Sequence, residues 1–87
     1  MAWHIVFTKQ SQADAKRLLQ AGLKPKALLI LDVLAQNPFE NPPSYEKLTG
    51  DLAGFYSRRI NIQHRIVYQV YKQEKTVKIV RMWTHYE

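Results

Sequence analysis

A short apolar run and two stretches of helical periodicity make up the first third of the chain. The run at residues 3–7, Trp-His-Ile-Val-Phe, is rich in aromatic and β-branched side chains and predicts a strand. Apolar residues then recur every three or four positions over residues 9–21 and from Pro25 to the Asn37-Pro38 pair, which predicts two helices. Thr8 suits an N-cap and Gly22 a C-terminal turn, so the helices form a hairpin. The predicted apolar stripes comprise Ala15, Leu18 and Leu19 in the first helix and Ala27, Leu28, Ile30, Leu31 and Leu34 in the second.

Beyond a proline-rich loop at residues 37–44, the pattern changes from helical spacing to strands. The predicted strands cover residues 44–48, 55–60, 65–71 and 76–85, with turn signals at Gly50, Asp51, Gly54 and at residues 61–63 and 72–75. Ile66, Tyr68 and Val70 share one face of their strand. Neither half of the chain could form a core alone, so we expect a single domain over residues 1–87. The predicted fold class is α+β, in which the N-terminal strand and the helical hairpin pack on a mostly antiparallel sheet and cover one of its faces.

The composition narrows the class of protein. With 87 residues, the chain has no room for a separate cofactor domain, and we expect no cofactor. Cysteine is absent, which excludes a disulfide framework, a thiolate zinc site and a catalytic thiol. The three histidines, His4, His64 and His85, lack metal-ligand spacing, so no metal site is expected. No apolar run approaches the roughly 20 residues of a membrane helix and no signal peptide is recognisable, so we expect a cytoplasmic protein without membrane contact.

Basic side chains outnumber acidic ones and gather in the second half of the chain. Lys and Arg number 13 against 7 Asp and Glu, and the net charge of +6 favours an anionic partner, either nucleic acid or an acidic protein. Four arginines lie on the predicted strands: Arg58, Arg59, Arg65 and Arg81. The aromatic residues interleaved with them are Tyr45, Phe55, Tyr56, Tyr68, Tyr71, Trp83 and Tyr86. Arginines mixed with aromatics on a sheet suit the stacking and phosphate contacts of RNA binding; the alternative is that most of these aromatics pack in the core.

Three pieces of sequence occur in order in the second half of the chain. They are the run from Glu46 to Ile60, which contains Gly-Phe-Tyr-Ser-Arg-Arg-Ile, then His64-Arg-Ile-Val-Tyr68, and the pair His85-Tyr86. Together with Asn37-Pro-Phe39, this set resembles the YoeB branch of the RelE-type toxins, the mRNA interferases of bacterial toxin–antitoxin pairs. The resemblance covers residues 37–86 closely and residues 1–36 in pattern only. It implies a RelE-like fold and a ribosome-dependent endoribonuclease that cuts mRNA in the ribosomal A site.

The resemblance also implies roles for individual residues. Glu46 falls at the position of the family's general base, Arg65 at that of its phosphate-binding arginine and His85 at that of its general acid. Arg59 and Tyr86 correspond to residues that support phosphate or RNA binding. In place of a lysine that the family often carries shortly after the leucine matching Leu48, this chain has Thr49 and Gly50. Whether the nearby Lys47 substitutes for it stays open.

These roles are chemically consistent without a metal. RNA is cleaved when its own 2′-hydroxyl attacks the phosphate, provided that a base takes the hydroxyl proton and an acid protonates the leaving 5′-oxygen. Glu46 and His85 would form such a pair, and Arg65 with Arg59 would stabilise the charge that develops on the phosphate. Arg81 is a further candidate for RNA binding because it lies among the arginines of the predicted sheet, with packing in the sheet as the alternative.

The family implies particular partners, and two other functions compete with the nuclease. The implied partners are mRNA on the ribosome and an acidic cognate antitoxin of the YefM kind with a segment that folds on binding; a homodimer is also compatible with the family. One alternative is a noncatalytic RNA- or ribosome-binding module, which would not need both Glu46 and His85. The other is a gyrase-poisoning toxin on the same scaffold, a branch whose members typically lack this base–acid pair.

Overall fold

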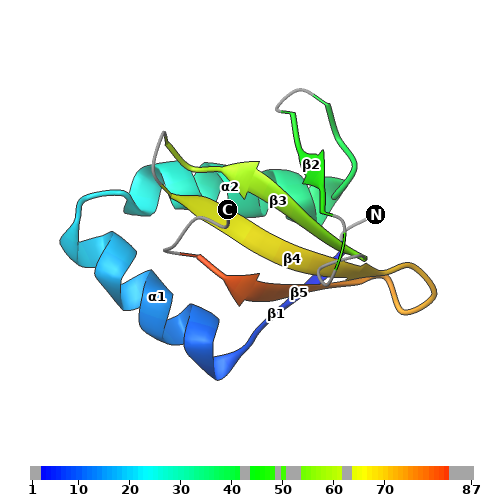
Figure 1. Ribbon diagram of the computed structural model, residues 1–87, viewed down its shortest axis with the longest axis horizontal. Coiled ribbons are helices and arrows are strands. Elements are labelled where there is room, and N and C mark those ends of the chain that lie inside the picture. Colours follow the sequence, from blue (N-terminus) through cyan, green and yellow to red (C-terminus); the bar gives the residue numbers. More distant parts are fainter. Residues whose placement is uncertain (1–2, 42–43, 49, 51–53, 62–63, 83–87) are drawn as a thin grey trace.

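The two helices and the sheet of the chain match the predicted class. The computed structural model describes residues 3–41, 44–48, 50, 54–61 and 64–82. Along the chain its elements are β1 (His4–Phe7), α1 (Lys9–Gln20), α2 (Lys24–Gln36), β2 (Glu46–Lys47), β3 (Phe55–Arg59), β4 (Arg65–Tyr71) and β5 (Thr76–Arg81). The strands form one sheet in the order β1-β5-β4-β3-β2, in which β1 runs parallel to β5 and the other neighbours are antiparallel (Figure 1). The fold is therefore α+β with a mostly antiparallel sheet, as predicted.

The capping and turn residues of the helical hairpin act as predicted. Thr8 is the N-cap of α1, and its Oγ1 accepts a hydrogen bond from the backbone N–H of Ser11 at 3.1 Å. The helix ends one residue earlier than expected, and Gly22 then adopts a φ of 75°, which favours glycine. Pro25 stands in the first turn of α2, and Asn37 is its C-cap. Among the described residues, no helix is long and apolar enough to cross a membrane.

The core lies between the helical hairpin and one face of the sheet. Its buried residues are Leu18, Ala27, Ile30, Leu34, Ile60, Ile66, Tyr68, Val77, Ile79 and Met82. Two residues of the predicted apolar stripes lie outside the core, since Leu19 is 57% exposed and Leu28 is 52% exposed. The buried face of α1 is completed instead by Ser11 and Asp14, two polar residues whose side chains are hydrogen-bonded and can therefore leave water.

Two of the predicted strands are shorter in the structure. The strand expected at residues 44–48 pairs only at Glu46 and Lys47, where it forms an edge of the sheet beside β3. The last strand, expected at residues 76–85, ends at Arg81 because the next backbone N–H, that of Met82, is bonded to a side chain of α1. Residues 83–87 lie outside the described part of the chain. β4 has the predicted bounds and β3 is one residue shorter than expected.

Several aromatic residues of the predicted RNA-stacking surface are packed against one another instead. Tyr45, Tyr56 and Tyr68 join Trp3 and Phe39 in an aromatic cluster, in which contacting ring centroids lie between 5.6 and 6.5 Å apart. The pair on β3 and β4 is stacked, and the other contacts are edge to face. For Tyr68, which is fully buried, the stacking hypothesis is wrong and the packing alternative is confirmed, whereas Tyr45 and Tyr56 are half-buried in the same cluster. Trp83 and Tyr86 lie outside the described residues.

Candidate active site

Polar side chains of three neighbouring strands meet on the face of the sheet that the helices leave uncovered. Because side chains alternate along a strand and the core residues of β4 face the helices, Arg65 points to the outer face. Arg59 of β3 is paired with Arg65, and Ser57, two residues earlier on the same strand, shares its face. Glu46 of the edge strand β2 is paired with Ser57. The sheet therefore gathers Glu46, Ser57, Arg59 and Arg65 into one group.

Glu46 and Arg65 form an ion pair that passes over β3. Nη1 of Arg65 donates a hydrogen bond to Oε1 of Glu46 and another, at 3.3 Å, to Oγ of Ser57. The arginine side chain is 18% exposed, whereas that of Glu46 is 63% exposed, so the guanidinium is held against the sheet and the carboxylate lies largely in water. An ion pair this open to solvent contributes only about 0–1 kcal/mol, and an anionic ligand can separate it at little cost.

A polar hollow adjoins this ion pair. It has a volume of about 290 Å³ and is lined by Ser44, Tyr45, Glu46, Ser57 and Arg59. The arrangement places a carboxylate, which can accept a proton, beside two guanidinium groups, which can bind a phosphate with charge-assisted hydrogen bonds. Of the sequence-predicted site residues, the structure thus brings together Glu46, Arg59 and Arg65.

Sequence reasoning did not single out Ser57, which is buried between the ion pair and the sheet. A signal was available, because Ser57 stands two positions before Arg59 on a predicted strand and so has to share its face. A serine in this buried position supplies a hydrogen-bond acceptor that holds the guanidinium of Arg65 against the sheet.

The two arginines of the Ser-Arg-Arg sequence point to opposite faces of the sheet. Arg59 is exposed, whereas Arg58 is only 1% exposed. Nη2 of Arg58 donates to the backbone carbonyls of Pro38 and Glu40 at 2.9 and 2.8 Å, and Nε donates to the hydroxyl of Tyr68 at 3.1 Å. Arg58 thus fastens the loop after α2 to the sheet, whereas Arg59 is open to solvent on the outer face.

Arg58 also supports the strand that carries Glu46. Its guanidinium carbon lies 5.0 Å from the ring centroid of Tyr45, the residue immediately before Glu46. The hydroxyl of Tyr68, which accepts from Arg58, donates in turn to the carbonyl of Pro38 at 3.3 Å. Burial raises the pKa of Tyr68 above its usual value, with the nearby charge of Arg58 and its hydrogen bond acting in the opposite direction. The phenol therefore stays protonated at neutral pH and keeps both hydrogen bonds.

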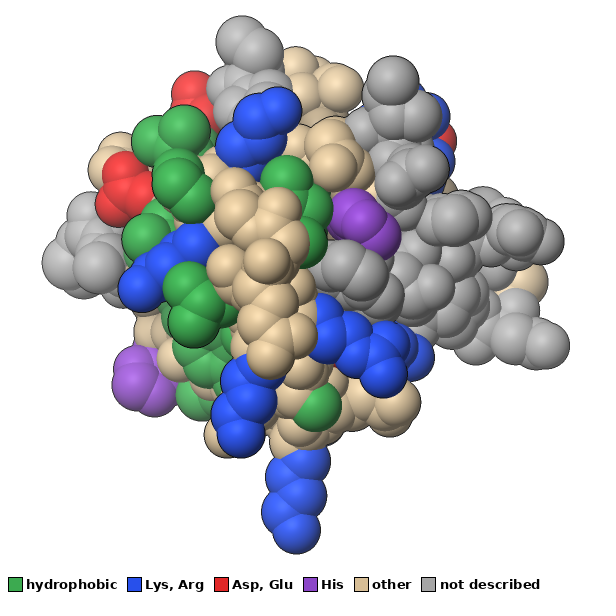
Figure 2. All heavy atoms as spheres, turned by 90° about the vertical axis from the view of Figure 1, so that its left-hand side faces the viewer, with side chains coloured by type: hydrophobic (Ala, Val, Ile, Leu, Met, Phe, Trp, Pro, Cys, Tyr) green, Lys and Arg blue, Asp and Glu red, His purple; other side chains and the backbone are tan. Residues whose placement is uncertain are grey.

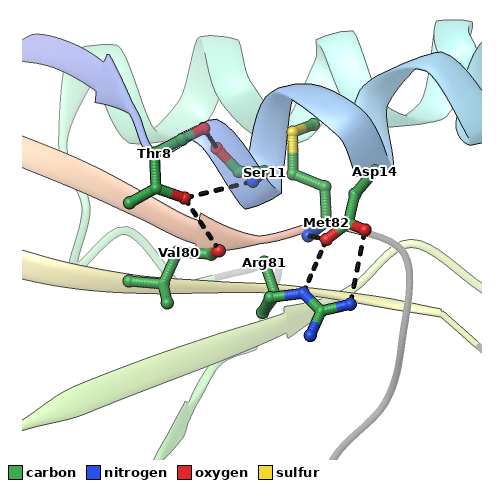
Figure 3. Close-up of polar contacts among 6 residues, drawn as sticks. All are labelled: Thr8, Ser11, Asp14, Val80, Arg81 and Met82. Atoms are coloured by element: carbon green, nitrogen blue, oxygen red, sulfur yellow. Dashed lines mark hydrogen bonds and ion pairs between the residues drawn. The ribbon is translucent and has the colours of Figure 1, made fainter.

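Arg81, a further RNA-binding candidate on the described strands, is engaged with α1 (Figure 3). Its Nε and Nη2 donate to the carboxylate of Asp14 at 2.7 and 3.3 Å, and the backbone N–H of Met82 donates to the same group at 3.1 Å. Oγ1 of Thr8 donates to the carbonyl of Val80 at 3.1 Å, so the end of β5 is fastened at two points. These contacts support the packing alternative for Arg81, and its contact with RNA stays a prediction.

The remaining two predicted site residues, His85 and Tyr86, lie outside the described residues, and their roles stay predictions. In the part of the chain that the structure describes, no group of three or more histidine, aspartate or glutamate side chains is placed to hold a metal ion.

Comparison with known proteins assigns the chain to a family. The model of the YoeB-like toxins of bacterial type II toxin–antitoxin systems matches residues 7–86. A Toxin YoeB from a Synechocystis strain is 33% identical over 87 residues, which are 100% of this chain and 91% of that protein. The chain therefore belongs to the YoeB-like toxins of type II toxin–antitoxin systems. The match extends the resemblance of the second half into the helical hairpin.

Solved structures of related toxins share the whole fold. The YoeB/ParE toxin from Agrobacterium tumefaciens superimposes with a TM-score of 0.86 at 29% identity, covering 95% of this chain and 99% of that one. The YoeB dimer from Staphylococcus aureus gives a TM-score of 0.82 at 34% identity and covers 99% of this chain and 100% of that one. A YoeB-YefM complex from the same organism gives 0.80 at 34% identity, with the same coverage.

Proposed function

We propose that this toxin is a ribosome-dependent mRNA endoribonuclease that works by general acid–base catalysis, with the 2′-hydroxyl of the RNA as the nucleophile. The observation that carries the proposal is the meeting of Glu46 with Arg65 and Arg59 beside a polar hollow on the outer face of the sheet. A carboxylate next to two guanidinium groups can take a proton from a hydroxyl while the phosphate is held.

In the proposed reaction, the scissile phosphate binds to Arg65 and Arg59. This draws Arg65 away from Glu46, whose carboxylate then takes the proton of the 2′-hydroxyl. The bond between O2′ and phosphorus forms, the bond from phosphorus to O5′ breaks, and His85 gives its proton to the leaving oxygen. The products are a 2′,3′-cyclic phosphate and a 5′-hydroxyl end. Tyr86 and Arg81 contribute contacts to the RNA.

The proposed partners follow from the charge of the chain and from its relatives. The mRNA is presented in the ribosomal A site, so the toxin acts in the cytoplasm, where messages are translated. A net charge of +6 suits both this substrate and an acidic antitoxin, and relatives from Staphylococcus aureus form YoeB-YefM complexes. A homodimer is proposed by analogy with the YoeB dimer of that organism.

The test is single-turnover cleavage of a defined mRNA on purified ribosomes, followed by analysis of the product ends. The wild-type chain should leave a 5′-hydroxyl end and a 2′,3′-cyclic phosphate or its 3′-phosphate hydrolysis product. Glu46→Gln and His85→Gln should each slow cleavage by at least about 10²-fold, because each removes a proton-transfer group of the transition state. Glu40→Gln is the matched control, since Glu40 is exposed and its contact with Arg58 is made by the backbone carbonyl.

Recovery of 5′-phosphate ends would contradict the proposed attack by the 2′-hydroxyl. Ribosome binding without any cleavage by the wild-type chain would favour the noncatalytic module. Growth arrest with intact mRNA and trapped gyrase–DNA complexes would favour the gyrase poison.

A further inference from the structure

A second hollow lies at the other side of the fold from Glu46. It is bounded by α1, α2 and the end of β1, it has a volume of about 290 Å³, and it shares no lining residue with the polar hollow. We refer to it as the hairpin groove and define it by Phe7, Lys16, Leu19, Lys24 and Leu28. Since β1 and β2 are the opposite edges of the sheet, the hairpin groove and the candidate active site are separate surfaces.

Large apolar side chains of the hairpin groove are left open to solvent. Phe7 is 41% exposed, Leu19 57% and Leu28 52%, although the helical periodicity of both leucines marks them as apolar-face residues. Figure 2, which faces the left-hand side of Figure 1, shows apolar side chains in green among lysine and arginine side chains in blue. A contiguous apolar surface with a charged rim is typical of a protein interaction site.

The charges around the groove are almost all positive. Lys16 and Lys24 belong to its lining, and three more exposed basic residues lie on the same two helices: Lys9, Arg17 and Lys26. Of the two acidic residues on these helices, Asp14 is buried in its ion pair with Arg81 and Asp32 is exposed. An occupant of the groove therefore has to bring apolar side chains together with negative charge.

We propose that the hairpin groove is the docking site for an acidic amphipathic helix of the antitoxin. Apolar residues of that helix would cover Phe7, Leu19 and Leu28, and its carboxylates would pair with Lys16 and Lys24. A second copy of this chain would bring the same lysines and a net charge of +6 to the contact and is disfavoured by repulsion. RNA would satisfy the lysines but would leave the leucines without apolar partners. The identity of the partner rests on the proposed function.

The proposal predicts that antitoxin binding and RNA cleavage can be separated by substitution, because the two surfaces share no lining residue. Leu28→Glu places a negative charge in the groove. Leu29→Glu is its matched control, because Leu29 is the next residue of α2, is 69% exposed and does not line the groove. Both substitutions add one charge at an exposed position of a helix and use a good helix former, so both chains should fold with unchanged thermal midpoints.

The probe is the purified acidic antitoxin that relieves growth arrest by this toxin, titrated into each toxin variant by calorimetry. We expect the Kd to rise at least about tenfold for Leu28→Glu and less than about twofold for Leu29→Glu. Both variants should still arrest growth and cut mRNA like the wild type, but coexpressed antitoxin should rescue only cells that carry Leu29→Glu.

A second pair of variants tests the charge complementarity. Lys24→Glu should weaken antitoxin binding and flatten its salt dependence, whereas Lys26→Glu, which lies on the same helix outside the groove lining, should do neither. Equal effects of the two lysine substitutions would contradict the proposed pairing.

Several outcomes would overturn the docking site. Equal antitoxin affinity of the Leu28→Glu and Leu29→Glu variants would do so directly. If Leu28→Glu kept its antitoxin affinity but lost a homodimer in sedimentation, the groove would be assigned to a second copy. If it kept its antitoxin affinity but lost ribosome binding, the groove would be assigned to RNA. Failure of the proposed function has a different signature, since the wild-type chain itself would then leave mRNA intact.

Discussion

Glu46 and Arg65 hold each other across β3, although their strands β2 and β4 are not neighbours in the sheet. Within the described residues, the contacts of Arg65 use Nη1 alone, so the opposite edge of the guanidinium can receive a phosphate. The pair also neutralises the carboxylate, which would otherwise repel an approaching RNA backbone. Arg65 thus pairs with Glu46 in the free chain, and in the proposed reaction the substrate phosphate would take the place of that carboxylate.

Replacing Arg65 should separate activity from stability. Arg65→Ala is expected to lower the single-turnover cleavage rate by about 10²–10³-fold, because it removes a donor to the developing phosphate charge. The thermal midpoint should change little, because the side chain lies on the outer face and its ion pair is exposed. Arg17→Ala on α1, which removes an exposed arginine far from the site, should keep the wild-type rate. An unfolded Arg65→Ala chain would contradict the outer-face placement.

Ser57 should position the guanidinium of Arg65 without being required for folding. Ser57→Ala removes the hydroxyl that accepts from Nη1, and we expect a fall in the cleavage rate of about two- to tenfold, the value of one ordinary hydrogen bond. Ser44→Ala is the control, because Ser44 lines the same hollow and makes no hydrogen bond with Arg65. Rates that do not differ between the two variants would exclude a positioning role for Ser57.

The contact of Asp14 with β5 should appear in stability measurements. Asp14→Asn keeps the size of the side chain but removes the charge that holds Arg81 and the backbone N–H of Met82, and a loss of about 1–3 kcal/mol is expected in chemical denaturation. Asp32→Asn should stay within about 0.5 kcal/mol of the wild type, because Asp32 is exposed and bonded only to Gln36 among the described residues. Similar losses for both variants would indicate a general charge effect instead.

Tyr68 should make stability depend on alkaline pH. At pH 7, Tyr68→Phe is expected to cost about 1–3 kcal/mol, because Nε of Arg58 loses a buried acceptor. Burial raises the pKa of Tyr68 in the folded chain, so the stabilisation from its hydroxyl is fully present below the unfolded tyrosine pKa of about 10 and is lost as the pH rises through the folded value.

The difference in unfolding free energy between the wild type and Tyr68→Phe should therefore shrink above about pH 10. Urea denaturation between neutral and strongly alkaline pH measures it. Tyr71→Phe is the control, because the Tyr71 hydroxyl is exposed and bonded to Gln69 on the same strand. A difference that stays constant with pH would contradict the assignment.

Local sequence signals were sufficient to predict the helices and the strands of the chain, though not every strand boundary. Thr8, Gly22 and Pro25 each have one dominant use at the end of a helix, and the alternation on β4 fixes which of its residues enter the core. The early end of β5 was not predictable, because it depends on a contact with a distant residue. For β5, that contact is the carboxylate of Asp14.

The candidate site was predictable where residue type and strand position agreed. Glu46, Arg59 and Arg65 fall on one face by alternation once β2, β3 and β4 are neighbours. The opposite fate of Arg58 follows from the same alternation, but burial of a guanidinium requires carbonyl acceptors from the loop at Pro38 and Glu40, which no local pattern reveals. The exposure of Leu19 and Leu28 likewise depends on how the two helices pack, which the periodicity of either helix alone does not give.

The parallel pairing of β1 with β5 has a consequence for folding during synthesis of the toxin. Thr8 at the end of β1 is bonded to Val80, 72 residues later, and β5 occupies an interior place between β1 and β4 while supplying Val77 and Ile79 to the core. A nascent chain whose last strand is still inside the ribosomal exit tunnel has neither a complete sheet nor a core for the helical hairpin to pack on. The toxin can therefore complete its fold only after β5 has left the exit tunnel.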